Sequence, residues 1–124
     1  MNRWLFLAIG SVAGGFSRYI LAETVHKKLG NDFPFGILIV NLIGCLLIGF
    51  FNTLAEEKML LGTNERLLLM AGFCGAFTTF SALILDSSKL ISADQWLRAG
   101  LNIGLSVALG LILFRVGSFL GKLA

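Results

Sequence analysis

The sequence predicts an all-α membrane protein with four transmembrane helices, the third of them broken at its midpoint. Hydrophobic residues make up 56% of the 124-residue chain. Charged residues make up only 14%, whereas soluble domains average about 25%. The hydrophobic residues fall into four segments that are each long enough to cross a bilayer as a helix. The third segment carries glycines and hydroxyl residues at its centre, where they weaken a continuous helix. Residues 1–124 are therefore expected to form a single transmembrane domain.

The first expected helix covers residues 4–22 and combines small residues with one charge. Gly10 and Gly14 form a ridge that allows close helix contact in lipid. Arg18 follows in the same segment. Because a charge within the membrane is costly, Arg18 either snorkels to the interface or lies at the mouth of an aqueous vestibule, where it attracts anions. The polar stretch 23–32 is expected to form the first loop.

The second expected helix covers residues 35–54 and contains one strongly polar side chain in its core. Pro34 can start this helix, since the first turn tolerates proline. Asn41 is the polar residue, and it has two interpretations. It either holds two helices together through a hydrogen bond or lines a pore as an amide donor. The break expected in the third helix favours the pore-lining interpretation.

The third expected helix covers residues 67–86, after a charged loop that ends with Thr63 or Asn64 as N-cap. Two glycines, two threonines and a serine lie between Gly72 and Ser81. A helix break at that depth must be buried in protein or line a polar cavity, because hydrocarbon cannot solvate freed backbone groups. Transporters hold ions at such breaks. This stretch is therefore the centre of the expected site.

The fourth expected helix covers residues 97–120 and follows Trp96, an expected interfacial anchor. Asn102, Ser106 and Gly110 are spaced i, i+4, i+8 and lie on one helix face. A helix-packing seam and a pore wall explain this stripe equally well, so both interpretations stay open.

Basic residues are balanced between the two sides of the expected bundle. One side carries Arg3, Lys58, Arg66 and Lys122, and the other carries Lys27, Lys28, Lys89 and Arg98. The positive-inside rule needs an imbalance to set orientation. We therefore expect insertion in both directions and assembly as an antiparallel homodimer. The net charge of +3 is spread over the loops and gives no reason to propose nucleic acid as a partner.

The polar groups that the sequence places in the middle of the membrane are uncharged. All seven carboxylates fall in loops or near expected helix ends. This argues against a proton-coupled carrier, which usually needs an ionisable side chain within the span. No nucleophile–base pair can be assembled there, so an enzyme is not expected, and Cys45, Cys74 and His26 show no metal-ligand spacing. Amides, hydroxyls and the positive edges of aromatic rings suit passive passage of a small anion.

At this point the residues resemble a known family, the Fluc/CrcB fluoride channels. The stretch Gly72–Ser81, which reads GFCGAFTTFS, is similar to that family's G-F-x-G-G-x-T-T-F-S signature. Val40–Gly44 matches its V-N-L-x-G, and Gly14–Arg18 is similar to its G-x-x-x-R. The resemblance covers all four segments in order and spacing.

The resemblance implies a passive fluoride channel that lowers cytoplasmic fluoride in the plasma (inner) membrane of a prokaryote. Its partners would be fluoride, the lipid bilayer and a second, antiparallel copy of itself. The implied pore residues are Asn41, Thr79, Phe80, Ser81 and Leu83, with Arg18 at the vestibule. A structural Na⁺ would be held by the backbone carbonyls of Gly75 and Thr78 from both subunits.

The sequence departs from the family pattern next to the signature. Leu83 stands where a second pore phenylalanine is usual, and Asp86 stands where the family tends to have glutamate. An aliphatic side chain cannot present a positive ring edge to an anion. The alternative function is a dual-topology four-helix exporter of the small multidrug resistance type, and a third is a non-conducting assembly subunit. Fluoride flux without a proton gradient is expected only of the channel.

Overall fold

Four helical spans make up the protein in the computed structural model, which describes residues 2–124; Met1, included in the expected domain, lies outside the described residues. The helices are α1 (Arg3–Leu29), α2 (Phe35–Glu56) and α6 (Trp96–Leu123), with a composite third span of α3 (Thr63–Arg66), η1 (Leu67–Cys74), α4 (Gly75–Phe77) and α5 (Phe80–Ser92). All four spans are long and apolar enough to cross a membrane. The predicted all-α class with four spans is confirmed.

All four spans are longer than the sequence predicted, the second by only two residues. The stretch from Glu23 to Leu29 continues α1 instead of starting a loop. The third span runs on to Ser92, so Asp86 lies inside a helix and not at its end. Its first turn is capped by Gly62 and not by Thr63 or Asn64. Hydropathy marks the part of a helix that crosses hydrocarbon, and the helix itself continues into the polar zone on either side.

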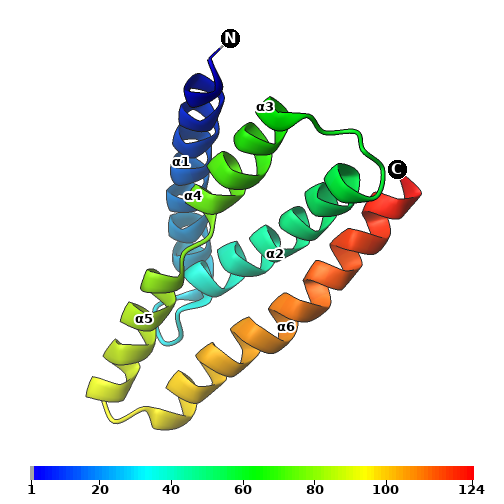
Figure 1. The fold of residues 1–124 in the computed structure, drawn as a ribbon. Coiled ribbons are helices and arrows are strands. Elements are labelled where there is room, and N and C mark those ends of the chain that lie inside the picture. Colours follow the sequence, from blue (N-terminus) through cyan, green and yellow to red (C-terminus); the bar gives the residue numbers. More distant parts are fainter. Residues whose placement is uncertain (1) are drawn as a thin grey trace.

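The third span is interrupted at two threonines. Thr78 has φ −90° and ψ 152°, and Thr79 has φ −152° and ψ 119°, which is extended backbone between α4 and α5. The side chain of Thr79 caps α5 by accepting a hydrogen bond from the Ala82 N–H at 3.3 Å. The predicted break is therefore confirmed, and the ribbon is uncoiled between α4 and α5 (Figure 1). The glycines of this stretch, Gly72 and Gly75, remain in helical backbone.

Close backbone contact joins α1 to the first half of the third span. A Cβ atom on Gly10 would collide with the carbonyl of Leu68, and one on Gly14 would collide with the carbonyl of Phe73. Both glycines are buried. Small residues let helices approach closely in lipid, where packing replaces the hydrophobic effect as the driving force. The predicted ridge of small residues is therefore the surface that α1 places against η1, and the two run side by side in Figure 1.

A second pair of helices, α2 and α6, lies beside the first pair (Figure 1). The hydroxyls of Thr53 on α2 and Ser118 on α6 share a hydrogen bond of 2.7 Å, and Thr53 is almost fully buried. Both chain ends lie at the same end of the bundle, as expected for four spans. The outer faces of α1 and α6 carry large exposed apolar side chains such as Phe16, Leu97 and Leu111. Surfaces of this kind suit lipid and not water.

Candidate functional site

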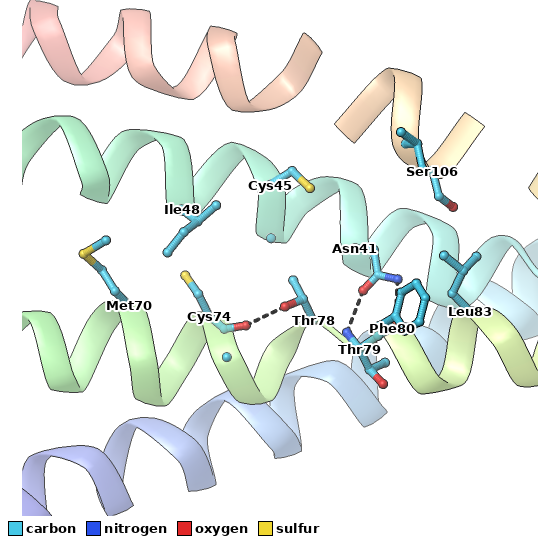
Figure 2. Close-up of a pocket in the computed structure, with 13 residues that line it drawn as sticks. Asn41, Cys45, Ile48, Met70, Cys74, Thr78, Thr79, Phe80, Leu83 and Ser106 are labelled. Carbon is cyan, nitrogen blue, oxygen red and sulfur yellow. Dashed lines mark hydrogen bonds between the residues drawn. The ribbon is translucent and has the colours of Figure 1, made fainter. Parts of the chain in front are cut away.

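A cavity of about 380 Å³ lies beside the break in the third span. Its lining comes from five elements and from the break itself: Asn41, Gly44, Cys45, Ile48, Met70, Cys74, Gly75, Thr78, Thr79, Phe80, Leu83, Ser106 and Val107 (Figure 2). We call it the central cavity. It brings together six of the residues that the sequence singled out for the pore and the cation, from Asn41 on α2 to Leu83 on α5. No carboxylate and no basic side chain is part of this lining.

The side chain of Asn41 holds the break in place. Its Nδ2 donates to the Thr79 carbonyl at 3.1 Å, and its Oδ1 accepts from the Thr79 N–H at 2.9 Å. Figure 2 shows the Asn41 amide facing the main chain of Thr79. The bond from the Thr79 N–H satisfies a donor that would otherwise be unpaired within the membrane, and the bond to the Thr79 carbonyl adds a donor to the N-cap carbonyl of α5. Asn41 therefore does link two helices, and it also lines the central cavity, with its second N–H hydrogen left over.

The pairing with Asn41 releases a carbonyl on the preceding turn. In a continuous α-helix the Gly75 carbonyl accepts from the N–H four residues later, which belongs to Thr79. That N–H is directed to Asn41. Thr78 follows the end of α4 and precedes the N-cap of α5, so its carbonyl lies outside both helices. The main chain at the break thus offers two acceptors without a helical donor.

Helix α2 approaches the break closely at Gly44. A Cβ atom at this position would collide with the Cγ2 methyl of Thr78 and would lie 3.5 Å from the Phe77 ring. The Thr78 hydroxyl donates to the Cys74 carbonyl at 2.8 Å, which turns its methyl group away from that bond. The break is therefore packed on one side by α2. Gly44 lies one turn after Asn41 in the sequence, so the same helix face both packs against and bonds to the break.

Hydroxyl groups surround the start of α5. Ser81 shares a hydrogen bond of 3.1 Å with the Thr79 hydroxyl and is exposed, outside the lining of the central cavity. The first N–H groups of α5 have no helical acceptor, because four donors are orphaned at every helix start. The buried hydroxyl oxygen of Ser106 has no hydrogen-bond partner within residues 2–124. Of these groups, the Ser106 hydroxyl lines the central cavity and the Ser81 hydroxyl lies outside it.

The stripe of Asn102, Ser106 and Gly110 on α6 was open to two interpretations, a helix-packing seam and a pore wall. Each interpretation holds for part of the stripe. Asn102 is 1% exposed and donates to the Ser87 hydroxyl at 3.0 Å, so it packs against α5. Gly110 packs against Cys45, whose sulfur would lie 3.2 Å from an added Cβ atom. Ser106, between them, reaches the central cavity. The stripe is a packing seam at its ends and a cavity wall in its middle.

The two positions expected to carry aromatic rings differ in environment. Phe80 is 75% exposed although it lines the central cavity, so its ring extends from the protein surface. Leu83 lies one turn later and is only 6% exposed. Phe80 is the first residue of α5, and Leu83 lies in the packed part of that helix.

Arg18 lies apart from the central cavity. It lines a shallow groove on α1 together with Ser11, Gly15, Phe16 and Tyr19. Its Nε atom is buried and makes no hydrogen bond within the described part of the chain. The structure therefore separates Arg18 from the other residues that the sequence singled out, and it assigns Arg18 neither to a salt bridge nor to the cavity.

Side-chain metal ligands do not cluster anywhere in residues 2–124: no three His, Cys, Asp or Glu side chains come together as a metal site. Cys45 and Cys74 both line the central cavity and are free thiols. With Met70 they give the cavity a sulfur-bearing wall that was not predicted from the sequence. Any cation at the break would therefore be held by main-chain carbonyls.

A multi-pass membrane protein whose broken helix borders a central cavity has the architecture of channels and transporters. Within that class, a family model described as CrcB-like protein, Camphor Resistance (CrcB), matches residues 5–118. The chain therefore belongs to the CrcB family, as the resemblance of its motifs indicated. Its bacterial relatives fit a multi-pass membrane protein of a prokaryote.

The relatives match over almost their whole length. One is the fluoride-specific ion channel FluC of Maridesulfovibrio salexigens, 40% identical over 123 residues, covering 99% of this chain and 98% of that protein. Another, with the same name, from Solidesulfovibrio magneticus, is 41% identical over 118 residues, covering 95% and 94%. A third of that name, from Trichormus variabilis, is 41% identical over 118 residues, covering 94% and 86%.

Proposed function

We propose that this protein is a passive fluoride-selective ion channel that exports fluoride and lowers its cytoplasmic concentration. The observation that carries this proposal is the neutral lining of the central cavity, where hydrogen-bond donors gather without any carboxylate or base. Such a cavity suits an anion and offers no group for proton coupling. The relatives named as fluoride-specific channels support the choice of ion and favour a channel over an enzyme.

Each candidate pore residue has a defined contribution in this proposal. Asn41 keeps the break open and directs its remaining N–H hydrogen to the ion. The Ser106 hydroxyl and the one hydroxyl of the Thr79–Ser81 pair that does not donate within that pair give further hydrogen bonds along α5 and α6. Phe80 presents a positive ring edge, and Leu83 closes the apolar side of the path. Together these groups replace part of the water that a fluoride ion sheds.

A second copy of the chain completes the site. Gly75 and Ser81 are exposed, and Phe80 extends from the surface at the break, where lipid would otherwise contact polar backbone. Hydrocarbon tolerates such backbone poorly. An antiparallel partner, inserted with the opposite orientation, would cover the break with its own break. The balanced basic residues support that dual topology, since they impose no preferred direction.

Sodium is the cation that the family resemblance implies, and the main chain fits it. The Gly75 and Thr78 carbonyls lack helical donors, and carbonyl oxygens suit hard cations. The face of Gly75 is open, because the nearest atom to an added Cβ is the Met70 carbonyl oxygen at 3.8 Å. Bound Na⁺ would supply a positive charge that holds the two copies together. Gly75 and Thr78 would serve it only through their backbone, which leaves the Thr78 hydroxyl on Cys74.

Arg18 attracts anions to an aqueous vestibule in this proposal. Its groove lies on α1, away from the central cavity, and its guanidinium makes no salt bridge in the described residues. A free cation near a vestibule raises the local concentration of anions. Arg18 would therefore affect the rate at which fluoride arrives and not its selection.

Fluoride efflux from liposomes tests the proposed function. Purified protein should release trapped fluoride when potassium and valinomycin compensate the charge, with no proton gradient across the membrane. Chloride-loaded liposomes provide the selectivity control. Release that needs a proton gradient would favour the exporter of the small multidrug resistance type, and no release in either condition would favour the non-conducting assembly subunit.

A further inference from the structure

One wall of the central cavity carries sulfur atoms. Met70 and Cys74 line the cavity from η1, and Cys45 lines it from α2. Cys74 is 3% exposed, and both cysteines are free thiols. The proposed fluoride path uses the amide, the hydroxyls and the aromatic ring of this cavity, and it gives the sulfur atoms no role.

Met70 and Cys74 lie on one face of the third span. They are four residues apart in a π-helical stretch, where the Gly75 N–H reaches back to the Met70 carbonyl, so about one turn separates them. Side chains at this spacing have Cβ atoms about 5–6 Å apart. Figure 2 shows both side chains projecting from the third span toward α2. A thioether and a thiol therefore reach the same side of the cavity.

Cys45 occupies a different position. Its sulfur lies at the contact between α2 and α6, where an added Cβ on Gly110 would be 3.2 Å from it. The central cavity thus contains two thiols on different helices, and only that of Cys74 has a thioether one turn away on its own helix.

The pair of sulfur atoms on the third span suits a soft monovalent metal ion. Thiolate and thioether ligands select soft ions such as Cu(I) over hard cations such as Na⁺. Zinc ordinarily takes four ligands, and the cavity lining contains no His, Asp or Glu side chain. A thiol that exchanges its proton for a monovalent ion leaves a complex without net charge. Such a complex avoids the cost of burying an unpaired charge in a cavity that has no charged side chain.

We propose that Met70 and Cys74 form a binding site for a soft monovalent metal ion, of the class of Cu(I) and Ag⁺, in the wall of the central cavity. On binding, the Cys74 sulfur releases its proton to water and bonds to the metal. The Met70 sulfur donates an electron pair, and no oxidation state changes. The site lies one turn before the break, since the Thr78 hydroxyl donates to the Cys74 carbonyl at 2.8 Å.

A metal ion at this site would narrow the cavity that Asn41 and the break also line. We therefore expect bound metal to slow fluoride flux about tenfold. This consequence rests on the proposed channel function, whereas the binding of the metal does not.

Counting bound silver by mass spectrometry tests the site directly. Ag⁺ serves as a redox-stable probe in nitrate buffer without chloride or added thiol, and unbound silver is removed by desalting in detergent. The wild type should retain about one Ag⁺ per chain. Cys74→Ser and Met70→Leu should each lower the affinity for silver about tenfold or more. Two matched controls should bind silver as the wild type does: Cys45→Ser, which removes the thiol beside α6, and Met59→Leu, which removes a thioether that is 76% exposed in the loop after α2.

The outcomes separate the site from its effect on flux. Wild-type silver binding by Cys74→Ser overturns the proposed site, and so does a loss confined to Cys45→Ser. Size-exclusion elution at the wild-type position shows that a variant without silver is still folded. Fluoride efflux from liposomes is then measured with and without Ag⁺, since silver fluoride is soluble. Silver that binds at Cys74 without slowing efflux overturns the block alone. A protein that passes no fluoride even without silver overturns the proposed function, and the silver count still decides the site.

Discussion

The side-chain amide of Asn41 and the main chain of Thr79 exchange two hydrogen bonds, of 3.1 and 2.9 Å, across 38 residues of sequence. One amide thereby mimics the pairing of a neighbouring strand for a single residue at the break, Thr79. The same side chain lines the central cavity. Removing it should therefore change the shape of the break as well as the donors available to an ion.

Asn41→Asp should reduce fluoride flux by about a hundredfold, because a carboxylate cannot donate to the Thr79 carbonyl and leaves it facing an acceptor. Asn41→Ser should retain part of the flux, since its hydroxyl can still form one hydrogen bond. Liposome efflux measures both. Asn64→Asp, the same change in a short helix at the bundle end, is the control and should conduct normally. Wild-type flux in Asn41→Asp would limit Asn41 to a structural role.

Phe80→Leu should lower fluoride flux about tenfold or more, because the neighbouring pore position is already aliphatic in Leu83 and no second ring edge remains. The ring is 75% exposed, so the change should hardly affect folding. Phe16→Leu on α1, where the ring is 68% exposed, is the matched control. If Phe80→Leu conducts as wild type does, the hydroxyls and not the ring must select the ion.

Leu83→Phe tests the same role of aromatic rings by adding a ring at the second pore position. The sequence alone suggested that a second ring would be tolerated and could raise the rate. Leu83 is only 6% exposed, however, and overpacking a buried site costs about 1–3 kcal/mol. We therefore expect the Leu83→Phe variant to have a lower melting temperature in detergent than the wild type. Any gain in fluoride flux should be measurable only per correctly folded molecule. An unchanged melting temperature would mean that the central cavity accommodates the larger side chain.

Gly75→Val should leave each subunit folded and prevent dimer assembly. The nearest atom to an added Cβ is 3.8 Å away within the subunit, so any obstruction arises only from a partner. Gly100→Val on α6 is the matched control, because no atom lies within 4 Å of its added Cβ. Light scattering in detergent reports the mass of each variant. A Gly75→Val protein that remains dimeric would contradict the proposed cation site at the break.

Orientation can be measured with a single exposed cysteine. Leu60→Cys lies in the loop between α2 and α3, with Cys45 and Cys74 replaced by alanine. A membrane-impermeant maleimide should modify roughly half of the molecules in intact cells, because the basic residues set no preferred direction. Complete labelling, or none, would rule out dual topology. Lysines added to the same loop should bias the ratio and lower the flux.

The sequence predicts some parts of this fold better than others, for physical reasons. The second span was placed correctly to within two residues because Pro34 limits its start and polar residues follow its end. The first span was predicted too short, because Glu23–Leu29 is polar but still helical. Hydropathy indicates only which part of a helix lies in lipid. The break was expected among glycines and hydroxyl residues, between Gly75 and Thr78, and it lies at Thr78 and Thr79, where Asn41 of another helix supplies replacement hydrogen bonds.

The site was predicted in outline, since the residues singled out on the second and third spans meet at one cavity. What the sequence could not predict is the direction of each side chain. The two bonds of Asn41, the burial of Leu83 and the position of Ser106 depend on how α2, α5 and α6 are rotated about their axes. That rotation comes from contacts such as Gly44 against Thr78, which have no local signal in the chain.

The π-helical stretch Leu67–Cys74, just before the break, has a consequence for how this sequence can change its length. The Gly75 N–H reaches back to the Met70 carbonyl, a bond that encloses one residue more than an α-helical turn does. The stretch therefore holds a spare residue within the segment that packs against α1. A one-residue deletion there could be absorbed by relaxation to an ordinary helix, with Thr78 and Thr79 kept in register with Asn41. The same deletion within α5 would rotate every later residue of that helix away from its neighbours.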